Sequence, residues 1–165
     1  MNVKSLRLFS LIPFITTILL LAYAYYEQYV DYLDPCPLCL VQRLVFLIIG
    51  LLYFITLIKP PVFIFRKIFA ILISIVSIIG CLISARHVWL QNLPADEVPA
   101  CGPGLSYMLE NFPLTSVLQD LFTGSGECAE ISWRFLGLTM PMWTFICFLG
   151  FLLYTIIWAN LKNEK

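Results

Sequence analysis

The sequence predicts an all-α membrane protein with a single domain, residues 1–165, folded as a four-transmembrane-helix bundle with a long outer loop that carries a short amphipathic helix. Hydrophobic side chains make up 61% of the chain and charged ones 12%, whereas soluble domains have about half apolar and about a quarter charged residues. A bilayer core of about 30 Å requires roughly 20 apolar residues in a helix. Stretches of that kind occupy residues 8–26, 38–58, 68–85 and 140–159.

The basic residues predict how the chain crosses the membrane. Seven of the ten Lys and Arg residues lie in the N-terminus, the connection 59–67 or the C-terminus, and segments rich in such residues stay in the cytoplasm. Nine of the ten acids lie in the other two connections. We therefore expect both termini in the cytoplasm and the loops 27–37 and 87–139 on the outer side. The seven basic residues are Lys4, Arg7, Lys59, Arg66, Lys67, Lys162 and Lys165.

The first apolar stretch has a second interpretation, a cleaved signal peptide. Lys4 and Arg7 precede an apolar run that reaches Ala22-Tyr23-Ala24, a pattern that signal peptidases accept. The run continues through Tyr25 and Tyr26 to a length that spans a bilayer, and Tyr is common at the membrane interface. We favour a transmembrane helix, and N-terminal sequencing of the mature protein distinguishes the two.

The second outer loop, 87–139, is longer than ordinary connections, which indicates a function. Apolar residues within it recur at the spacing of one helical face. The segment is predicted to be an amphipathic helix that lies on the outer membrane surface; a short helix packed on the loop itself is the alternative. These apolar residues are Leu114, Val117, Leu118, Leu121 and Phe122.

Six cysteines divide by position. Cys81 and Cys147 fall inside the third and fourth apolar stretches, where a thiol acts as a small packing group. The other four lie on the predicted outer side, in a compartment that permits disulfides. They are Cys36, Cys39, Cys101 and Cys128.

The run Cys36-Pro37-Leu38-Cys39 opens the second predicted helix. Unpaired N–H groups at a helix start stabilise a thiolate, which favours a redox-active pair over a structural bridge. Arg43 follows Cys39 by one helical turn and shares its face. A charge inside an apolar span indicates a functional site; the alternative is that the guanidinium reaches back to the lipid headgroups.

Cys101 and Cys128, taken alone, are consistent with a disulfide that staples the loop. A redox-active pair on the same side makes exchange between the two pairs the simpler explanation, and the segment Gly124-Ser125-Gly126 would let Cys128 approach Cys36. The apolar location of Cys39 and Arg43 then suggests a lipid-soluble quinone as the electron acceptor.

A zinc site formed by the cysteines and His87 is the less favoured interpretation. The second pair lacks C-x-x-C spacing, and oxidation competes with metal binding outside the cytoplasm, so we expect no metal site. His87 follows Arg86 near the end of the third stretch. We interpret it as a polar residue at the membrane interface, with a contact to a redox cofactor as the alternative.

Taken together, these features resemble the DsbB family, disulfide bond formation protein B of the bacterial inner membrane. The resemblance covers nearly the whole chain: Cys36-Pro37-Leu38-Cys39 with Arg43, the outer loop with Cys101, and the run from Gly124 through Cys128 and Trp133 to Met140-Pro141. It implies a membrane enzyme, a thiol:quinone oxidoreductase, with the four outer cysteines as catalytic residues.

The resemblance also implies an order of events. A DsbA-like thioredoxin-fold oxidase of the periplasm would attack Cys101, Cys128 would exchange with Cys36, and Cys39 would pass electrons to a bound quinone, ubiquinone or menaquinone. Arg43 would stabilise the charge, and Gln28 and His87 would be further residues of the quinone site.

Two other functions fit parts of the pattern. A four-span scaffold with a disulfide-stapled loop would not need a reducible pair at the second helix, so Cys39→Ser separates it from an oxidase. The vitamin K epoxide reductase group also couples a membrane C-x-x-C to a quinone, but its pair belongs to a late helix.

Overall fold

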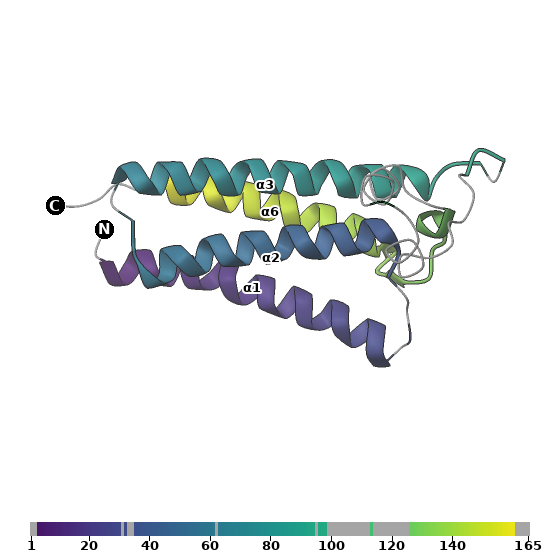
Figure 1. Cartoon of the computed structure of the whole chain (residues 1–165), viewed down its shortest axis with the longest axis horizontal. Coiled ribbons are helices and arrows are strands. Elements are labelled where there is room, and N and C mark those ends of the chain that lie inside the picture. The colour runs from purple at the N-terminus through teal and green to yellow at the C-terminus, as the bar shows by residue number, and fades with distance from the viewer. Residues whose placement is uncertain are drawn as a thin grey trace.

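Four long helices form the body of the computed structural model, which describes residues 3–30, 32, 35–61, 63–94, 96–98, 113 and 126–160. The helices are α1 (Val3–Val30), α2 (Pro37–Ile58), α3 (Phe63–Leu90) and α6 (Met140–Asn160). All four are long and apolar enough to cross a membrane, which confirms the predicted four-span, all-α fold. In Figure 1, α1 begins and α6 ends at the same end of the bundle. We call the opposite end, where α1 ends and α2 begins, the outer end.

The helix boundaries were predicted closely for two helices and too short for the others. α2 and α6 differ from their predicted ranges by one residue at most at each end, but α1 and α3 continue to Val30 and Leu90. The predicted loop starts at residues 27 and 87 are therefore wrong. Hydropathy marks the part of a helix that lies in lipid, whereas backbone hydrogen bonds continue into the polar region beyond it. The predicted amphipathic helix at 114–122 lies outside the described residues.

The core of the bundle contains closely packed aromatic rings. α3 packs on α6, and α2 packs on both α1 and α3. Phe46 of α2 stacks on Phe148 of α6 with ring centroids 4.2 Å apart. Gly80 of α3 faces the same ring, and a Cβ at this position would lie 2.7 Å from it. Small residues of this kind let membrane helices approach closely.

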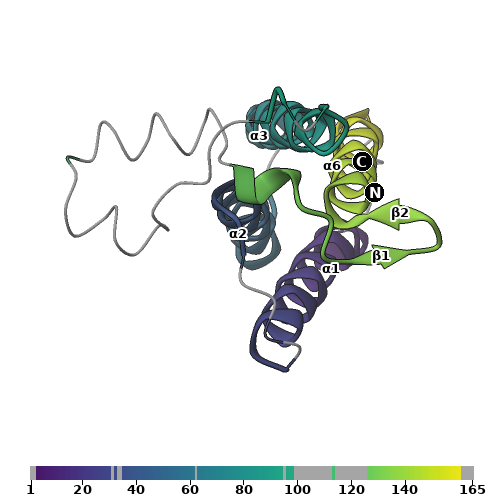
Figure 2. The ribbon, with the colours of Figure 1, turned by 90° about the vertical axis from the view of Figure 1, so that its right-hand side faces the viewer.

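A short helix and a hairpin precede α6 at the outer end. Residues Gly126–Ala129 form a 3₁₀ helix, η1, and β1 (Arg134–Phe135) pairs antiparallel with β2 (Leu138–Thr139). The two-residue turn between the strands has positive φ at Leu136 (52°) and Gly137 (81°), as tight hairpins require. Figure 2 shows η1 across the outer ends of α2 and α3, and the hairpin beside α1 and α6.

Candidate thiol site and apolar cavity

The C-x-x-C pair is held by the first turn of α2. Cys36 is the N-cap residue, with extended backbone (φ −63°, ψ 161°), and Pro37 occupies the first helical position, where its missing N–H has no consequence. The backbone N–H of Leu40 donates to the Cys36 carbonyl at 3.2 Å, which begins the helix. The Cys36 and Cys39 Sγ atoms are 3.0 Å apart, beyond the roughly 2.05 Å of a disulfide. No disulfide bond joins these two sulfur atoms in this structure.

Cys128 reaches the same place from the opposite side. It lies in η1, which packs against α3, and its side chain is fully buried. The Sγ atoms of Cys36 and Cys128 and a ring nitrogen of His87 all lie within 4.8 Å of one another. Residues from two outer segments, far apart in sequence, thus meet at the outer end of α3. Cys101, the predicted partner of Cys128, lies outside the described residues.

His87 is buried in the bundle rather than exposed at the membrane interface. Its side chain is 2% exposed, so the interfacial interpretation is wrong. Because α3 continues to Leu90, His87 lies a turn inside the helix and faces α2. Its Nε2 atom is 3.7 Å from Cys36 Sγ, and its Nδ1 atom is 3.2 Å from the Nε2 atom of Gln42.

Gln42 is a site residue that the sequence analysis did not identify. Its side chain is buried, and its Oε1 atom accepts a hydrogen bond of 3.0 Å from Thr144 of α6. Thr144 also contacts Ser84 of α3 at 3.1 Å. The amide therefore links three helices and fixes the His87 ring against Cys36. The available signal was a polar residue inside an apolar span, the same one that pointed to Arg43.

The surroundings of Cys36 favour its protonated form. A hydrogen bond with Cys128 lowers the pKa of the Cys36 thiol, but the hydrogen bond with Cys39 and burial together raise it further, and the net result is a raised pKa.

Arg43 is bound by α1 rather than by solvent. Its Nη1 atom donates to Gln28 Oε1, and its Nη2 atom donates to the Ala24 carbonyl at 2.9 Å. The guanidinium also lies over the ring of Tyr25, 5.1 Å from the centroid, within the range of a cation–π contact. Three residues of α1 thus hold the charge of Arg43 in place.

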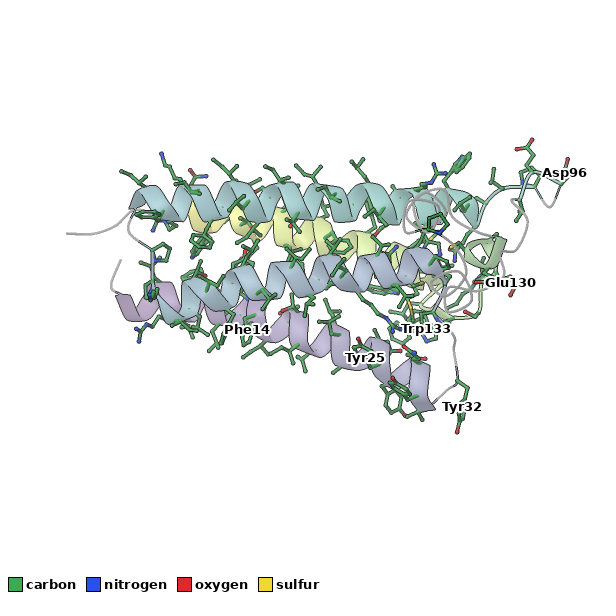
Figure 3. All side chains as sticks on the ribbon, in the orientation of Figure 1. Phe14, Tyr25, Tyr32, Asp96, Glu130 and Trp133 are labelled. Atoms are coloured by element: carbon green, nitrogen blue, oxygen red, sulfur yellow. The ribbon has the colours of Figure 1, made fainter. Side chains whose placement is uncertain are left out.

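An apolar cavity of about 420 Å³ lies between Cys39, Arg43 and the outer hairpin. Ring contacts close its outer side: Trp133 meets Tyr23 edge-on at 6.2 Å and stacks on Phe135 at 6.1 Å. Figure 3 shows Trp133 and Tyr25 near the outer end of α1. The lining residues are Leu20, Leu21, Tyr23, Ala24, Cys39, Gln42, Arg43, Phe46, Trp133, Phe135, Met140, Trp143, Thr144 and Cys147.

The predicted quinone residues hold different positions around this cavity. Cys39 and Arg43 line it directly. Gln28 reaches it only through its hydrogen bond to Arg43, and His87 lies beside Cys36 and Gln42 and is not a lining residue. Cys147, predicted to have a packing role, also contributes to the wall.

The fold and the site define a multi-pass membrane protein with a cluster of thiols at one end of its bundle and an apolar cavity beside one of them. The family model described as disulfide bond formation protein DsbB matches residues 6–158. The chain therefore belongs to the DsbB family, and this membership implies a membrane protein that acts in disulfide bond formation.

Individual relatives match this chain over most of their own length. The chain is 50% identical to the disulfide bond formation protein B of Nitrosococcus oceani over 145 residues, which covers 88% of this chain and 86% of the relative. It is 44% identical to the protein of the same name from Methylococcus capsulatus over 164 residues, covering 99% of this chain and all of the relative.

Proposed function

We propose that this protein is a thiol:quinone oxidoreductase of the bacterial inner membrane. It reoxidises a periplasmic DsbA-like thioredoxin-fold oxidase and passes the electrons to a membrane quinone, ubiquinone or menaquinone. Both termini are cytoplasmic and the cysteine-bearing loops are periplasmic. The observation that carries the proposal is the position of Cys39, whose side chain lines the apolar cavity while its Sγ atom is 3.0 Å from Cys36 Sγ.

The first half of the reaction transfers the partner's electrons to the pair in α2. One thiol of the partner attacks Cys101 of a Cys101–Cys128 disulfide and forms a mixed disulfide. The partner's second thiol then breaks this bond, so the partner leaves as a disulfide and Cys101 and Cys128 are both left as thiols. Cys128 attacks Cys36 of the Cys36–Cys39 disulfide, and Cys39 leaves as a thiolate. Cys101 then closes onto Cys128 and releases Cys36. The distance of at most 4.8 Å between Cys36 and Cys128 supports the middle step.

The second half restores the Cys36–Cys39 disulfide. A quinone supplies a two-electron, two-proton acceptor when bound, and an aromatic-lined cavity of about 420 Å³ with one guanidinium suits its ring and its oxygens. Cys36 and Cys39 rejoin as their two electrons and two protons leave. Arg43 stabilises negative charge at Cys39 and in the cavity, and Gln28 positions Arg43. His87 and Gln42 hold the Cys36 side chain.

The proposal is tested by turnover with purified, quinone-loaded protein and a reduced thioredoxin-fold partner. We expect the quinone absorbance to fall with wild type and not with Cys39→Ser. Cys81→Ser is the matched control, because Cys81 packs against the core away from both the thiol cluster and the cavity, and it should turn over normally. Lack of turnover by folded wild type with every such partner would refute the proposal.

A second experiment identifies the partner. In Cys128→Ser, Cys101 has lost its disulfide partner, so its thiolate attacks the disulfide of an oxidised partner and forms a mixed disulfide, and no Cys128 thiol is present to displace that partner. A mixed disulfide between Cys101 and the physiological partner should then accumulate in cells, and mass spectrometry of the trapped species names that protein. A scaffold with a stapled loop would trap nothing.

A further inference from the structure

The cluster at the outer end of α3 has the composition of a metal site. Cys36, Cys128 and His87 come from three different elements and present two sulfur atoms and a nitrogen within 4.8 Å of one another. All three are at most 9% exposed. Cys39 adds a third sulfur 3.0 Å from that of Cys36. Cys36 and Cys39 form the C-x-x-C pair, whereas His87 and Cys128 lie far along the chain, so the spacing argument that predicted no metal site did not foresee that these side chains meet.

The distances suit a tetrahedral cation. Zn–S and Zn–N bonds of about 2.3 and 2.0 Å place ligand atoms roughly 3.3–3.8 Å apart around the metal. Cys36 Sγ is 3.7 Å from His87 Nε2, which matches this spacing. Cys39 Sγ is 3.0 Å from Cys36 Sγ but does not lie within 4.8 Å of all three atoms of the cluster, so its side chain must rotate toward the ion to become the fourth ligand. Thiolate and imidazole ligands select Zn²⁺ over Mg²⁺ or Ca²⁺, which prefer oxygen.

The contacts around His87 orient its ring toward the thiols. A ligating imidazole uses one nitrogen for the metal and is oriented by a hydrogen bond at the other. Here Nε2 faces the Cys36 sulfur, and Nδ1 faces the Gln42 amide nitrogen, which can only donate, so in this structure Nε2 carries the ring proton. Metal binding at Nε2 moves the proton to Nδ1, and a flip of the amide then lets Gln42 Oε1 accept from Nδ1–H while the Thr144 hydroxyl keeps its hydrogen bond to the Pro141 carbonyl. Thr144 in turn anchors that amide from α6. His87 is therefore preorganised with Nε2 directed at the thiols.

We propose that the reduced protein binds one Zn²⁺ ion through Cys36, Cys128 and His87, with Cys39 as the fourth ligand, and that the ion inhibits disulfide exchange. The inference goes beyond the proposed function, because binding requires only the thiols and the imidazole. The ion holds the sulfur atoms that exchange needs, so oxidation and metal binding exclude each other. Zn²⁺ stabilises the reduced state because the disulfide form lacks its ligands.

The test titrates the full-length, detergent-solubilised, reduced protein with Zn²⁺ against a chromophoric chelator. Cd²⁺ serves as a second probe, because cadmium thiolates have an ultraviolet charge-transfer band. We expect one ion per chain. His87→Ala and Cys128→Ala should each weaken binding by about tenfold or more, the lower bound set by the loss of an outer-shell partner. Cys81→Ser should bind Zn²⁺ as wild type does. Wild-type protein with its disulfides formed should not bind the ion.

Two outcomes would overturn the inference. Absence of stoichiometric binding to the reduced wild type is one. The other is binding that is lost in Cys36→Ser but unchanged in both His87→Ala and Cys128→Ala, since the ion would then sit on the C-x-x-C pair alone. Circular dichroism of each variant confirms its fold, and His87→Gln replaces the ring if His87→Ala unfolds. Metal-free quinone turnover is measured separately, so failure here leaves the proposed function intact.

Discussion

Arg43 places a permanent charge one helical turn inside the apolar span of α2. A charged group in a bilayer is tolerated when protein groups replace its water. Gln28 and the Ala24 carbonyl accept its hydrogen bonds, and Tyr25 covers it. The charge is thus fixed at the cavity wall beside Cys39 rather than drawn to the lipid headgroups.

Replacing Arg43 should affect the quinone more than the protein partner. Arg43→Ala removes a fixed positive charge from the cavity, and hydrogen bonds to charged groups contribute about 1.5–3 kcal/mol. We expect the apparent KM for quinone to rise roughly 10- to 100-fold, with little change in partner binding. Arg43→Lys keeps the charge but loses the two-point geometry and should be intermediate. An unchanged quinone KM in Arg43→Ala would remove Arg43 from the site.

Replacing Gln42 should impair the protein as strongly as replacing Arg43, because Gln42 connects three helices. Gln42→Leu leaves the buried Nδ1 atom of His87 and the hydroxyl of Thr144 without this amide, and an unsatisfied buried polar group costs about 1–3 kcal/mol. We expect lower thermal stability and slower exchange between Cys128 and Cys36 in rapid-quench experiments. Gln42→Glu keeps the acceptor for the Thr144 hydroxyl but loses the NH₂ group that faces His87 Nδ1, so it should recover only part of the rate. Equal stability of Gln42→Leu and wild type would contradict this account of the network.

At the scale of elements, the approach of α3 to α6 is set by a single glycine. Phe148 is fully buried and stacked on Phe46, so its ring has little room to move away from a Cβ at residue 80. Gly150 of α6 has no atom within 4 Å of an added Cβ. The two glycines therefore form a matched pair, one inside a helix contact and one outside it.

Gly80→Ala should separate these helices and destabilise the bundle by about 1–3 kcal/mol, the usual cost of overpacking a core. Gly150→Ala should be neutral or slightly stabilising, because Ala favours helix by about 0.5–1 kcal/mol over Gly. Unfolding in graded mixtures of mild and denaturing detergent measures both. Similar stabilities for the two variants would show that the contact of Gly80 with Phe148 does not limit the packing.

Sequence reasoning was accurate for elements whose signal is local. Apolar stretches of bilayer length predicted all four long helices, and Pro37 predicted the start of α2 within one residue. The ends of α1 and α3 were missed because the hydropathy of the sequence drops before the helix ends. The contact of His87 with Cys36 joins residues 51 positions apart, and one sequence has no periodicity that reports such a pairing. Cys39 and Arg43 were found because both share one helix face.

At the scale of the whole molecule, the charge distribution implies one orientation in the membrane. Asp96 and Glu130 lie at the outer end (Figure 3), and exposed Lys59 follows α2 at the other end. Membrane-impermeant maleimide added to intact spheroplasts should label Asp96→Cys and should not label Lys59→Cys until the membrane is permeabilised. The measured quantity is the labelling of each variant above that of the parent protein, whose native cysteines give the background. The reverse pattern would invert the proposed topology.

The start of α2 lies between two sites, the cluster of Cys36, Cys128 and His87 and the apolar cavity lined by Cys39. Under the proposed function, the soluble thiol donor and the membrane quinone would therefore bind without sharing a surface. The two substrates would bind independently, because the electrons would be stored in the reduced Cys36–Cys39 pair between the two half-reactions. We therefore expect a ping-pong mechanism, for which double-reciprocal plots at several quinone concentrations form parallel lines.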